Sequence, residues 1–277
     1  MKASGFAQKY GPYALVAGGS DGLGAEFAEG IARRGVNLVL IARNVERLEA
    51  TAARIAAEHG VDVVPVAADM ADFESVAMRL SALKTGALKV GAQDVETMPL
   101  EIGLLVYDAA FAPIGPFADA NPDDLAQAAA VNVRSPLLLA RLLAAPMIER
   151  GRGGIVFMSS LAGGQGGPNL AAYAATKAFT TVLAEGLWHE LRPRGVDVLV
   201  CTAGAIVTPG YRGASGAKAV PGILPADAVA ETALRALGRG PVVIPGATNK
   251  LGRFVMTRLL SRRGAIALMA KNTGGLQ

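Results

Sequence analysis

Three places in the chain share one local pattern: a polar helical stretch ends at a glycine, and a run of Val, Leu and Ile follows at once. They are residues 34–41, 59–64 and 194–200. Glycine just beyond a helix adopts the left-handed conformation that ends the helix. A continuous aliphatic run is typical of a strand that is buried on both faces. The repetition of helix, stop and buried strand therefore predicts βαβ units and a parallel sheet.

The same pattern places seven strands and six helices along the chain. The predicted strands cover residues 13–17, 36–41, 61–64, 102–107, 155–158, 196–200 and 242–244. The predicted helices cover residues 22–34, 45–59, 73–83, 122–150, 169–191 and 225–237. Right-handed crossovers put helices on both faces of such a sheet. The predicted fold class is α/β, a doubly wound, Rossmann-like parallel sheet of seven strands whose order stays open. No interior linker divides the chain, so we expect one domain over residues 1–277, with a basic helical segment at about 246–277.

Composition narrows the class of protein. Hydrophobic residues make up 52% of the 277 and charged residues only 18%, which excludes a disordered chain. The single cysteine, Cys201, excludes an internal disulfide, and His59 and His189 are too far apart in sequence to suggest zinc, so we expect no metal. The N-terminus has no signal-peptide core, and Arg134 and Arg141 interrupt the most apolar stretch. We therefore expect a soluble, cytoplasmic protein without a membrane-spanning helix.

Positive charge is concentrated near the end of the chain. The formal net charge is +4, but residues 232–277 hold eight Lys and Arg and no Asp or Glu, against 19 basic and 23 acidic residues elsewhere. No nucleic-acid-binding motif accompanies this charge, so we expect no nucleic-acid partner. Within residues 246–277 apolar side chains are interleaved with arginines. Such a face is either simply solvated or attracts an anionic partner, and a weak peripheral membrane contact is slightly favoured over a coenzyme A thioester.

A glycine-rich turn follows the first predicted strand and leads into a helix. Residues 17–24 read AGGSDGLG. Glycine lets the backbone approach a pyrophosphate closely, and the helix N-terminus offers free N–H groups and a positive dipole to the anion. The alternatives are an ordinary turn and, for Asp21, a helix cap. We expect a dinucleotide site here, and its candidate residues are Gly18, Ser20, Asp21, Gly22, Leu23 and Gly24.

The end of the second predicted strand bears on the choice of dinucleotide. NAD sites usually carry an Asp or Glu near this point, which binds the adenosine ribose. This chain has Arg43 and Asn44 instead. A guanidinium suits a 2′-phosphate, which a carboxylate would repel. We expect NADP(H) rather than NAD(H), the alternative being a solvated arginine.

Three further polar residues are candidates for proton chemistry. Tyr173 and Lys177 lie four positions apart and share one face of a predicted helix. Ser160 follows the strand predicted at 155–158, at the end of a parallel strand where ligands bind. Its alternative role is that of a turn-forming hydroxyl.

The glycine-rich turn, Ser160, and the Tyr173–Lys177 pair follow one another along the chain in the order seen in the short-chain dehydrogenase/reductase family. From Tyr13 to about Pro245 the chain resembles this family. The resemblance implies a catalytic tetrad of Ser160, Tyr173, Lys177 and Asn132. It also implies that Asp69 and Met70 lie beside the adenine, and that Thr208 contacts the nicotinamide end or the pyrophosphate. The other positions that it implies for the cofactor are Asp108, Ala109, Ala110, Gly204 and Ile206.

The chemistry expected of the tetrad follows from its groups. Tyr173 would give a proton to the substrate carbonyl oxygen as hydride arrives from the nicotinamide, and would take it back in the reverse direction. Free tyrosine titrates near 10, so the ammonium of Lys177 is expected to lower its pKa and also to bind the cofactor ribose. Ser160 would hydrogen-bond the same oxygen. For Asn132 the resemblance implies a water or a backbone kink that links Lys177 to solvent.

The chain departs from the family pattern after the fourth predicted strand. The family usually has Asn-Asn-Ala-Gly there, and residues 107–110 are Tyr-Asp-Ala-Ala. Asp108 brings a charge and loses the amide donors, and Ala110 adds a methyl group. A second departure is Ala203-Gly204, where the family has Pro-Gly. We expect these changes to affect cofactor affinity more than chemistry.

Taken together, the sequence predicts an NADP(H)-dependent oxidoreductase that acts on a carbonyl or secondary alcohol of an apolar substrate, with a steroid-like or 3-oxoacyl-like compound weakly favoured. The alternative is a catalytically weak or inactive NADP-binding sensor or regulatory protein, which the residues at 107–110 motivate. A sugar-nucleotide epimerase would need a larger substrate domain. The resemblance also implies a homodimer or homotetramer that associates through the long helices at 122–150 and 169–191.

Overall fold

The computed structural model describes residues 3–84, 100–207 and 222–273. Seven parallel strands form the central sheet in the order β3-β2-β1-β4-β5-β6-β9. Their bounds are β1 Tyr13–Ala17, β2 Asn37–Ala42, β3 Val63–Ala67, β4 Ile102–Tyr107, β5 Gly153–Ser160, β6 Val196–Ala203 and β9 Val242–Val243. A separate parallel pair joins β7 (Ile206–Val207) to β8 (Leu224–Pro225). The predicted fold class is confirmed.

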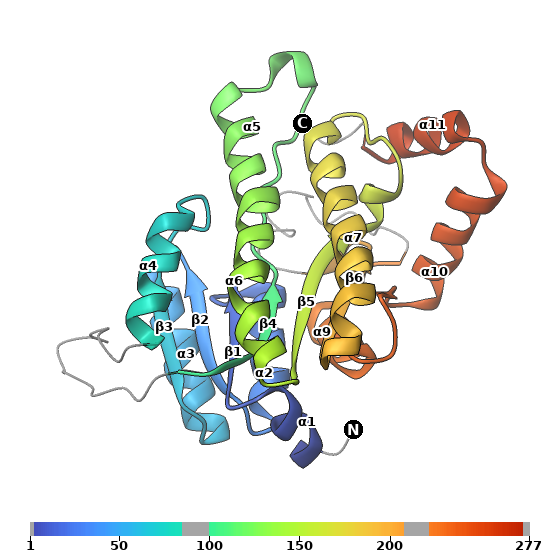
Figure 1. Cartoon of the computed structure of the whole chain (residues 1–277). Helices are drawn as coiled ribbons and strands as arrows, with labels where there is room; N and C mark the ends of the chain where they lie inside the picture. The colour runs from blue at the N-terminus through green and yellow to red at the C-terminus, as the bar shows by residue number, and fades with distance from the viewer. Residues whose placement is uncertain (1–2, 85–99, 208–221, 274–277) are drawn as a thin grey trace.

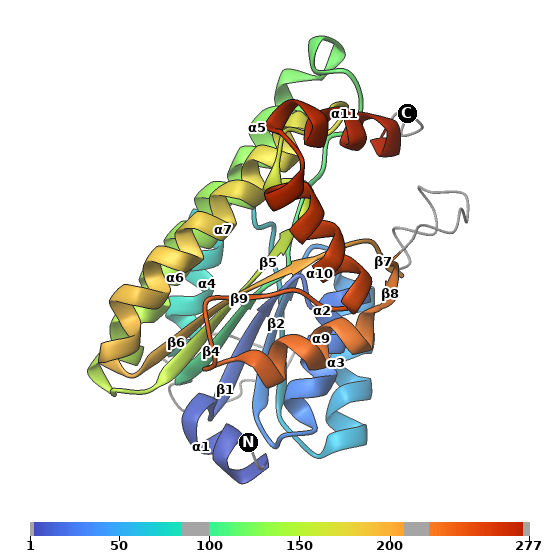
Figure 2. The same ribbon diagram turned by 90° about the vertical axis from the view of Figure 1, so that its right-hand side faces the viewer.

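Helices cover both faces of the sheet, which Figure 2 shows edge-on. One layer contains α1 (Ala3–Tyr10), α2 (Gly22–Ala32), α3 (Val45–His59) and α9 (Ala226–Ala236), and the other contains α4 (Phe73–Lys84), α6 (Ser135–Glu149) and α7 (Ala171–Leu191). Alternate residues of each strand enter opposite cores: Val16 belongs to the first core, and Leu15 and Ala17 belong to the second. Both faces are therefore buried, which explains the aliphatic runs in the sequence.

The glycine stops behave as the pattern predicts. Gly35, Gly60 and Gly195 have φ angles of 73°, 64° and 81°. Gly60 ends α3, and its N–H donates to the carbonyl of Ala56. The left-handed conformation is open to glycine without a steric penalty, so each helix ends where the next strand begins.

The predicted helix at 122–150 is interrupted by a π-helical turn. α5 (Pro122–Ala129) leads into η2 (Ala130–Arg134) and then into α6. Pro136 has no N–H to give to the carbonyl of Asn132, so the regular ladder cannot run through this point. Residues 122–149 form the one helical stretch, within the described ranges, that is long and apolar enough to cross a membrane, and half of its apolar window is buried inside the protein.

Some elements were not predicted. The N-terminal helix α1 packs under the sheet with Phe6 and Tyr10 almost fully buried, and the Tyr10 hydroxyl donates to Asp197 at 2.6 Å.

The basic segment forms α10 (Ala247–Phe254), the π-helical turn η5 (Val255–Leu259) and α11 (Arg262–Thr273), in agreement with the helical expectation. It runs along the outer flank of the molecule (Figure 1).

The strand order creates one position where a ligand fits. From β1 the chain moves outward through β2 and β3, then returns and moves the other way through β4, β5 and β6. β1 and β4 are neighbours, so their connections leave toward opposite faces and a crevice opens at their carboxyl ends.

Candidate active site

A cavity of about 810 Å³ lies at this crevice. Its walls come from the segments that follow β1 to β6, from the start of α7 and from α11. Sixteen of the predicted site residues line it: Gly18, Ser20, Asp21, Gly22, Leu23, Arg43, Asn44, Asp69, Met70, Asp108, Ala109, Ala110, Ser160, Tyr173, Gly204 and Ile206. Gly24, Asn132 and Lys177 lie behind this lining, and Thr208 falls outside the described residues.

The glycine-rich turn is packed too closely for side chains. A Cβ added at Gly18, whose φ is 91°, would lie 2.9 Å from the backbone nitrogen of Ala109. A Cβ at Gly24 would lie 2.0 Å from the carbonyl oxygen of Gly18. Gly24 therefore serves the packing of α2 against the turn, and Gly18 keeps the cavity floor open beside the N-terminus of α2. This is the cradle that a pyrophosphate requires.

Asp21 has a different role from the predicted cap. It occupies the N-cap position of α2, but its side chain makes no capping hydrogen bond. Its carboxylate instead pairs with Arg47 at 3.0 Å. The capping alternative for Asp21 is therefore wrong, because a guanidinium holds the carboxylate away from the helix.

Two arginines lie where the adenosine end of a dinucleotide would lie. Arg43 follows β2, and Arg47 is one turn into α3; both line the cavity. Asn44 caps α3 by accepting the Arg47 N–H at 2.8 Å, which fixes the start of this helix. The sequence reasoning missed Arg47. Its signal was present, because a helix that begins at Val45 turns a side chain at 47 back toward the preceding loop.

Asp69 and Met70 follow β3 on the same side. Asp69 accepts the Ala71 N–H at 2.8 Å, and the Met70 carbonyl accepts the buried hydroxyl of Ser135. Both side chains line the cavity near its adenosine end, next to Ala68.

Ser160 and Tyr173 meet at the other end of the cavity. Ser160 is the last residue of β5, and its hydroxyl accepts the Ala162 N–H at 3.2 Å. Burial raises the pKa of Tyr173 above its ordinary value of 10.0, while a hydrogen bond with Ser160 lowers it and the charge of Asp108 raises it further. The net direction is upward, which differs from the expected lowering by Lys177, because burial of the phenol is the largest effect.

Lys177 lies under Tyr173 and is 6% exposed. Its ammonium donates to the Met158 carbonyl at 2.9 Å and lies 5.6 Å from the centroid of the Tyr173 ring. Burial lowers its pKa to about 8, and the charge of Asp108 acts in the opposite direction. The structure thus brings Ser160, Tyr173 and Lys177 together, as their spacing on β5 and α7 predicts.

Asn132 joins two segments near the site and does not reach the cavity. Within η2, its side-chain amide donates to the Phe111 carbonyl at 2.7 Å and to the Thr176 hydroxyl at 3.1 Å, and its oxygen accepts the Phe111 N–H at 2.8 Å. It therefore fixes the segment after β4 against the turn of α7 that precedes Lys177.

Asp108, the main departure from the family pattern, lies deep beside the glycine-rich turn. Burial raises its pKa to about 6, while the charge of Lys177 and a hydrogen bond from the Gly24 N–H lower it and the charge of Asp21 raises it. The carboxyl group thus already accepts one of the N–H groups at the start of α2.

Apolar side chains, one of them from α11, line the cavity near Ser160 and Tyr173. Leu161, Leu170 and Met269 line it. α11 is held over the loop after β5: Arg262 donates to the Gly164 carbonyl at 2.9 Å, and the side chain of Ile266 lies 3.6 Å from the Cβ position of Gly166. The sequence reasoning missed this wall, because a helix so far along the chain carries no local sign of what it covers.

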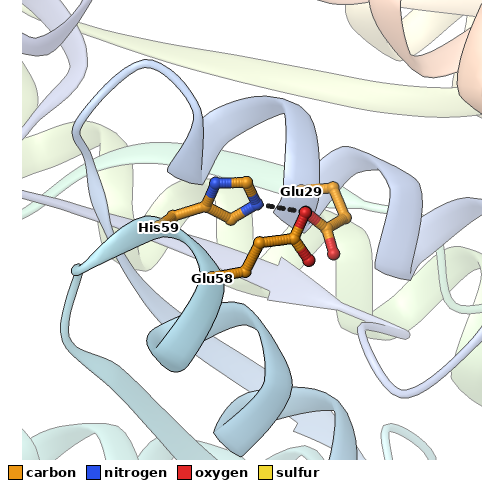
Figure 3. Close-up of side chains that lie close together, drawn as sticks. All are labelled: Glu29, Glu58 and His59. Carbon is orange, nitrogen blue, oxygen red and sulfur yellow. Dashed lines mark hydrogen bonds and ion pairs between the residues drawn. The ribbon is translucent and has the colours of Figure 1, made fainter.

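A second polar cluster lies outside the cavity (Figure 3). Atoms of Glu29, Glu58 and His59 that could bind a metal lie within 4.8 Å of one another. However, the Glu29 carboxylate already accepts hydrogen bonds from His59 and Arg54, and Arg54 also pairs with Glu58 at 3.5 Å. We interpret the cluster as ion pairs that tie α2 to α3.

Comparison with known proteins gives the same picture. The family model for short chain dehydrogenases matches residues 12–217. A 7beta-hydroxysteroid dehydrogenase of Clostridium sardiniense is 26% identical over 96% of this chain and 97% of its own length. A very-long-chain 3-oxoacyl-CoA reductase of Phaeosphaeria nodorum is 32% identical over 72% of this chain, which spans 55% of that protein.

Solved structures agree. A structure of a 7beta-hydroxysteroid dehydrogenase, from work on its stereoselectivity, superposes with a TM-score of 0.84 at 26% identity, over 96% of this chain and 99% of the other. A short-chain dehydrogenase from Sphingobium yanoikuyae in complex with NADPH gives a TM-score of 0.74 at 32% identity, over 85% and 88%. The family model matches most of the chain and the folds agree, so the chain belongs to the short-chain dehydrogenase/reductase family of oxidoreductases.

Proposed function

We propose that this oxidoreductase transfers hydride between NADP(H) and a carbonyl or secondary alcohol of a bulky apolar substrate. The observation that carries the proposal is a single cavity that holds the glycine-rich turn, two arginines and the Ser160–Tyr173 pair.

The residues at the adenosine end support NADP(H). Arg43 and Arg47 offer two guanidiniums to a 2′-phosphate, and within the described ranges Asp21 is the only carboxylate seen to pair with either of them. Guanidinium groups bind phosphate through paired hydrogen bonds, and no carboxylate stands at the end of β2 to take the ribose hydroxyls. Structural relatives bound to NADPH agree with this choice.

The residues at the other end support proton transfer. When bound, the nicotinamide supplies or accepts the hydride. Burial raises the pKa of Tyr173, so its phenol is protonated near neutral pH and has a proton to give to a carbonyl oxygen that gains charge. The Ser160 hydroxyl is placed to hydrogen-bond the same oxygen. Lys177 provides a positive charge beneath the phenol, and Asn132 is a positioning residue for this part of α7.

The apolar wall supports the substrate class. Leu161, Leu170 and Met269 offer no charge to a ligand. A steroid-like or 3-oxoacyl-like ketone fits this wall, and the hydroxysteroid and 3-oxoacyl relatives favour the same compounds. The inactive-sensor alternative needs a feature that prevents proton transfer, and the described residues offer none.

Association through the long helices remains a proposal as well. Leu137 on α6 and Val182 on α7 are exposed, as expected of helices that pack against another subunit. A mass measurement in solution tests it, and a monomer would contradict it.

The proposed reaction is tested by a panel of ketones with NADPH and with NADH, followed by the loss of reduced cofactor. We expect bulky apolar ketones to be reduced faster than small polar ones, and NADPH to be preferred. Equal rates with both cofactors would contradict the choice of NADP(H), and turnover of only charged or sugar substrates would contradict the substrate class.

A further inference from the structure

The segment from Ala247 to Thr273, called here the C-terminal arm, carries unpaired positive charge. It contains six Lys and Arg and no Asp or Glu, whereas the rest of the chain has 21 basic and 23 acidic residues. Among the described residues, no carboxylate forms an ion pair with Arg253, Arg258 or Arg263. These positive charges can therefore attract anions outside the protein.

The same arm exposes large apolar side chains. Of the eleven large hydrophobic residues exposed in the described ranges, five lie on the arm: Leu251, Phe254, Leu259, Leu260 and Leu268. α10 differs from a normal surface helix, because it buries a polar side chain and exposes large apolar ones. Its buried residue is Asn249, which donates to the Gly222 and Pro245 carbonyls at 3.0 Å each, while Leu251 and Phe254 are 64% and 54% exposed. Clustered exposed apolar side chains mark an interaction surface.

The arm forms part of the wall of the proposed substrate site. It runs along the outer flank of the molecule, beside the start of α7 (Figures 1 and 2). α11 contributes Met269 to the cavity wall, and the neighbouring Leu268 is 40% exposed. One helix thus borders both the cavity and the exposed apolar surface.

We propose that the C-terminal arm docks on the surface of an anionic lipid bilayer. Leucine and phenylalanine tips beside arginine heads match the boundary between acyl chains and negative headgroups. A nucleic acid would meet the arginines but offers no apolar phase to the leucines. If the proposed function is correct, docking also brings the α11 wall of the cavity close to the phase in which an apolar ketone dissolves.

The first test measures flotation of the full-length protein with vesicles of phosphatidylcholine, alone or mixed with phosphatidylglycerol. We expect binding to the anionic vesicles only, weakened by salt. Replacing Arg253, Arg258 and Arg263 by Gln should weaken binding about a hundredfold. The matched control replaces Arg33, Arg194 and Arg239 by Gln, which removes the same charge from exposed sites off the arm. An equal loss in both triple variants would overturn the proposal, because it would reflect net charge alone.

The second test keeps the charge and removes the apolar tips. Replacing Leu251, Phe254 and Leu259 by Ser should abolish flotation, while reduction of a water-soluble ketone stays normal, because none of the three lines the cavity. Unchanged flotation would overturn the proposal. The proposal would also be overturned if the triple Ser variant had a lower mass in solution than the unmodified protein but bound vesicles equally well. That result would mean that the arm contacts a second copy of the chain. Since flotation needs no turnover, failure of the proposed reaction would leave this result readable.

Discussion

Asp108, a half-buried residue of the cavity wall, and the buried Lys177 attract one another at the candidate active site. Burial raises the pKa of Asp108 to about 6 and lowers that of Lys177 to about 8, and the attraction between the two partly offsets each change. Asp108 also accepts the Gly24 N–H at the start of α2, where a pyrophosphate is expected to bind. The carboxylate of Asp108 therefore lies beside the site proposed for the pyrophosphate of the cofactor, which is also an anion.

This arrangement predicts pH-dependent cofactor affinity. Above pH about 6 Asp108 is charged and repels the dinucleotide, and below it the group is neutral, so its effect weakens binding as pH rises. Replacing Asp108 by Asn should tighten NADPH binding by about tenfold at pH 8 and by little at pH 5. Fluorescence titration of both proteins at each pH measures this, and the comparison cancels ionisation of the cofactor's own phosphates. Equal affinity of the two proteins at pH 8 would contradict the role of Asp108.

The arginine at the end of β2 should decide between the two dinucleotides. Arg43→Asp removes a phosphate partner and adds a repelling carboxylate, so the preference for NADPH over NADH should fall by about 10- to 100-fold. The ratio of kcat/KM for the two cofactors measures the change. Arg194→Asp, on an exposed arginine that does not line the cavity, is the control and should leave the ratio unchanged. An unchanged ratio in Arg43→Asp would assign the 2′-phosphate to another residue.

The wall formed by α11 should limit the size of the substrate. Met269→Trp adds volume inside the cavity and should raise KM for bulky ketones about tenfold or more, with little effect on small ones. Leu268→Trp places the same side chain on the neighbouring exposed position and serves as the control. If both variants change KM equally, the wall does not select substrates.

The side-chain hydrogen bonds of Asn132 should contribute more to the free energy of unfolding than the hydrogen bond of an ordinary helix cap. Asn132→Ala leaves the Phe111 N–H and carbonyl without their partners in a partly buried place, and should lower the free energy of unfolding by about 2–3 kcal/mol. Asn44→Ala removes a single capping bond and should cost about 1 kcal/mol. Urea denaturation compares them, and equal losses would mean that Asn132 does not hold the segment in place.

The fold was predictable where local and tertiary preferences agree. α3 begins and ends at the predicted residues, because Asn44 caps it and Gly60 stops it. The π-helical turn around Asn132 was not predicted, since it depends on long-range bonds to Phe111 and Thr176 as well as on Pro136. α1 was missed because its burial comes from packing under the sheet rather than from a local pattern.

The candidate site was predictable to the extent that its residues follow strands. Gly18, Asp108 and Ser160 come at or just after the ends of parallel strands, and such ends meet at one edge of a sheet. Met269 lies far along the chain, and only the path of α11 over the loop after β5 brings it to the cavity.

The proposed proton donor is tested most directly by Tyr173→Phe. This change removes one oxygen and keeps the ring that packs over Lys177. The initial rate of NADPH oxidation with a bulky ketone should fall by about 10²-fold or more, while NADPH binding, measured by fluorescence titration, stays within a few-fold of the unmodified protein. A variant that binds NADPH and reduces the ketone at a near-normal rate would contradict the account.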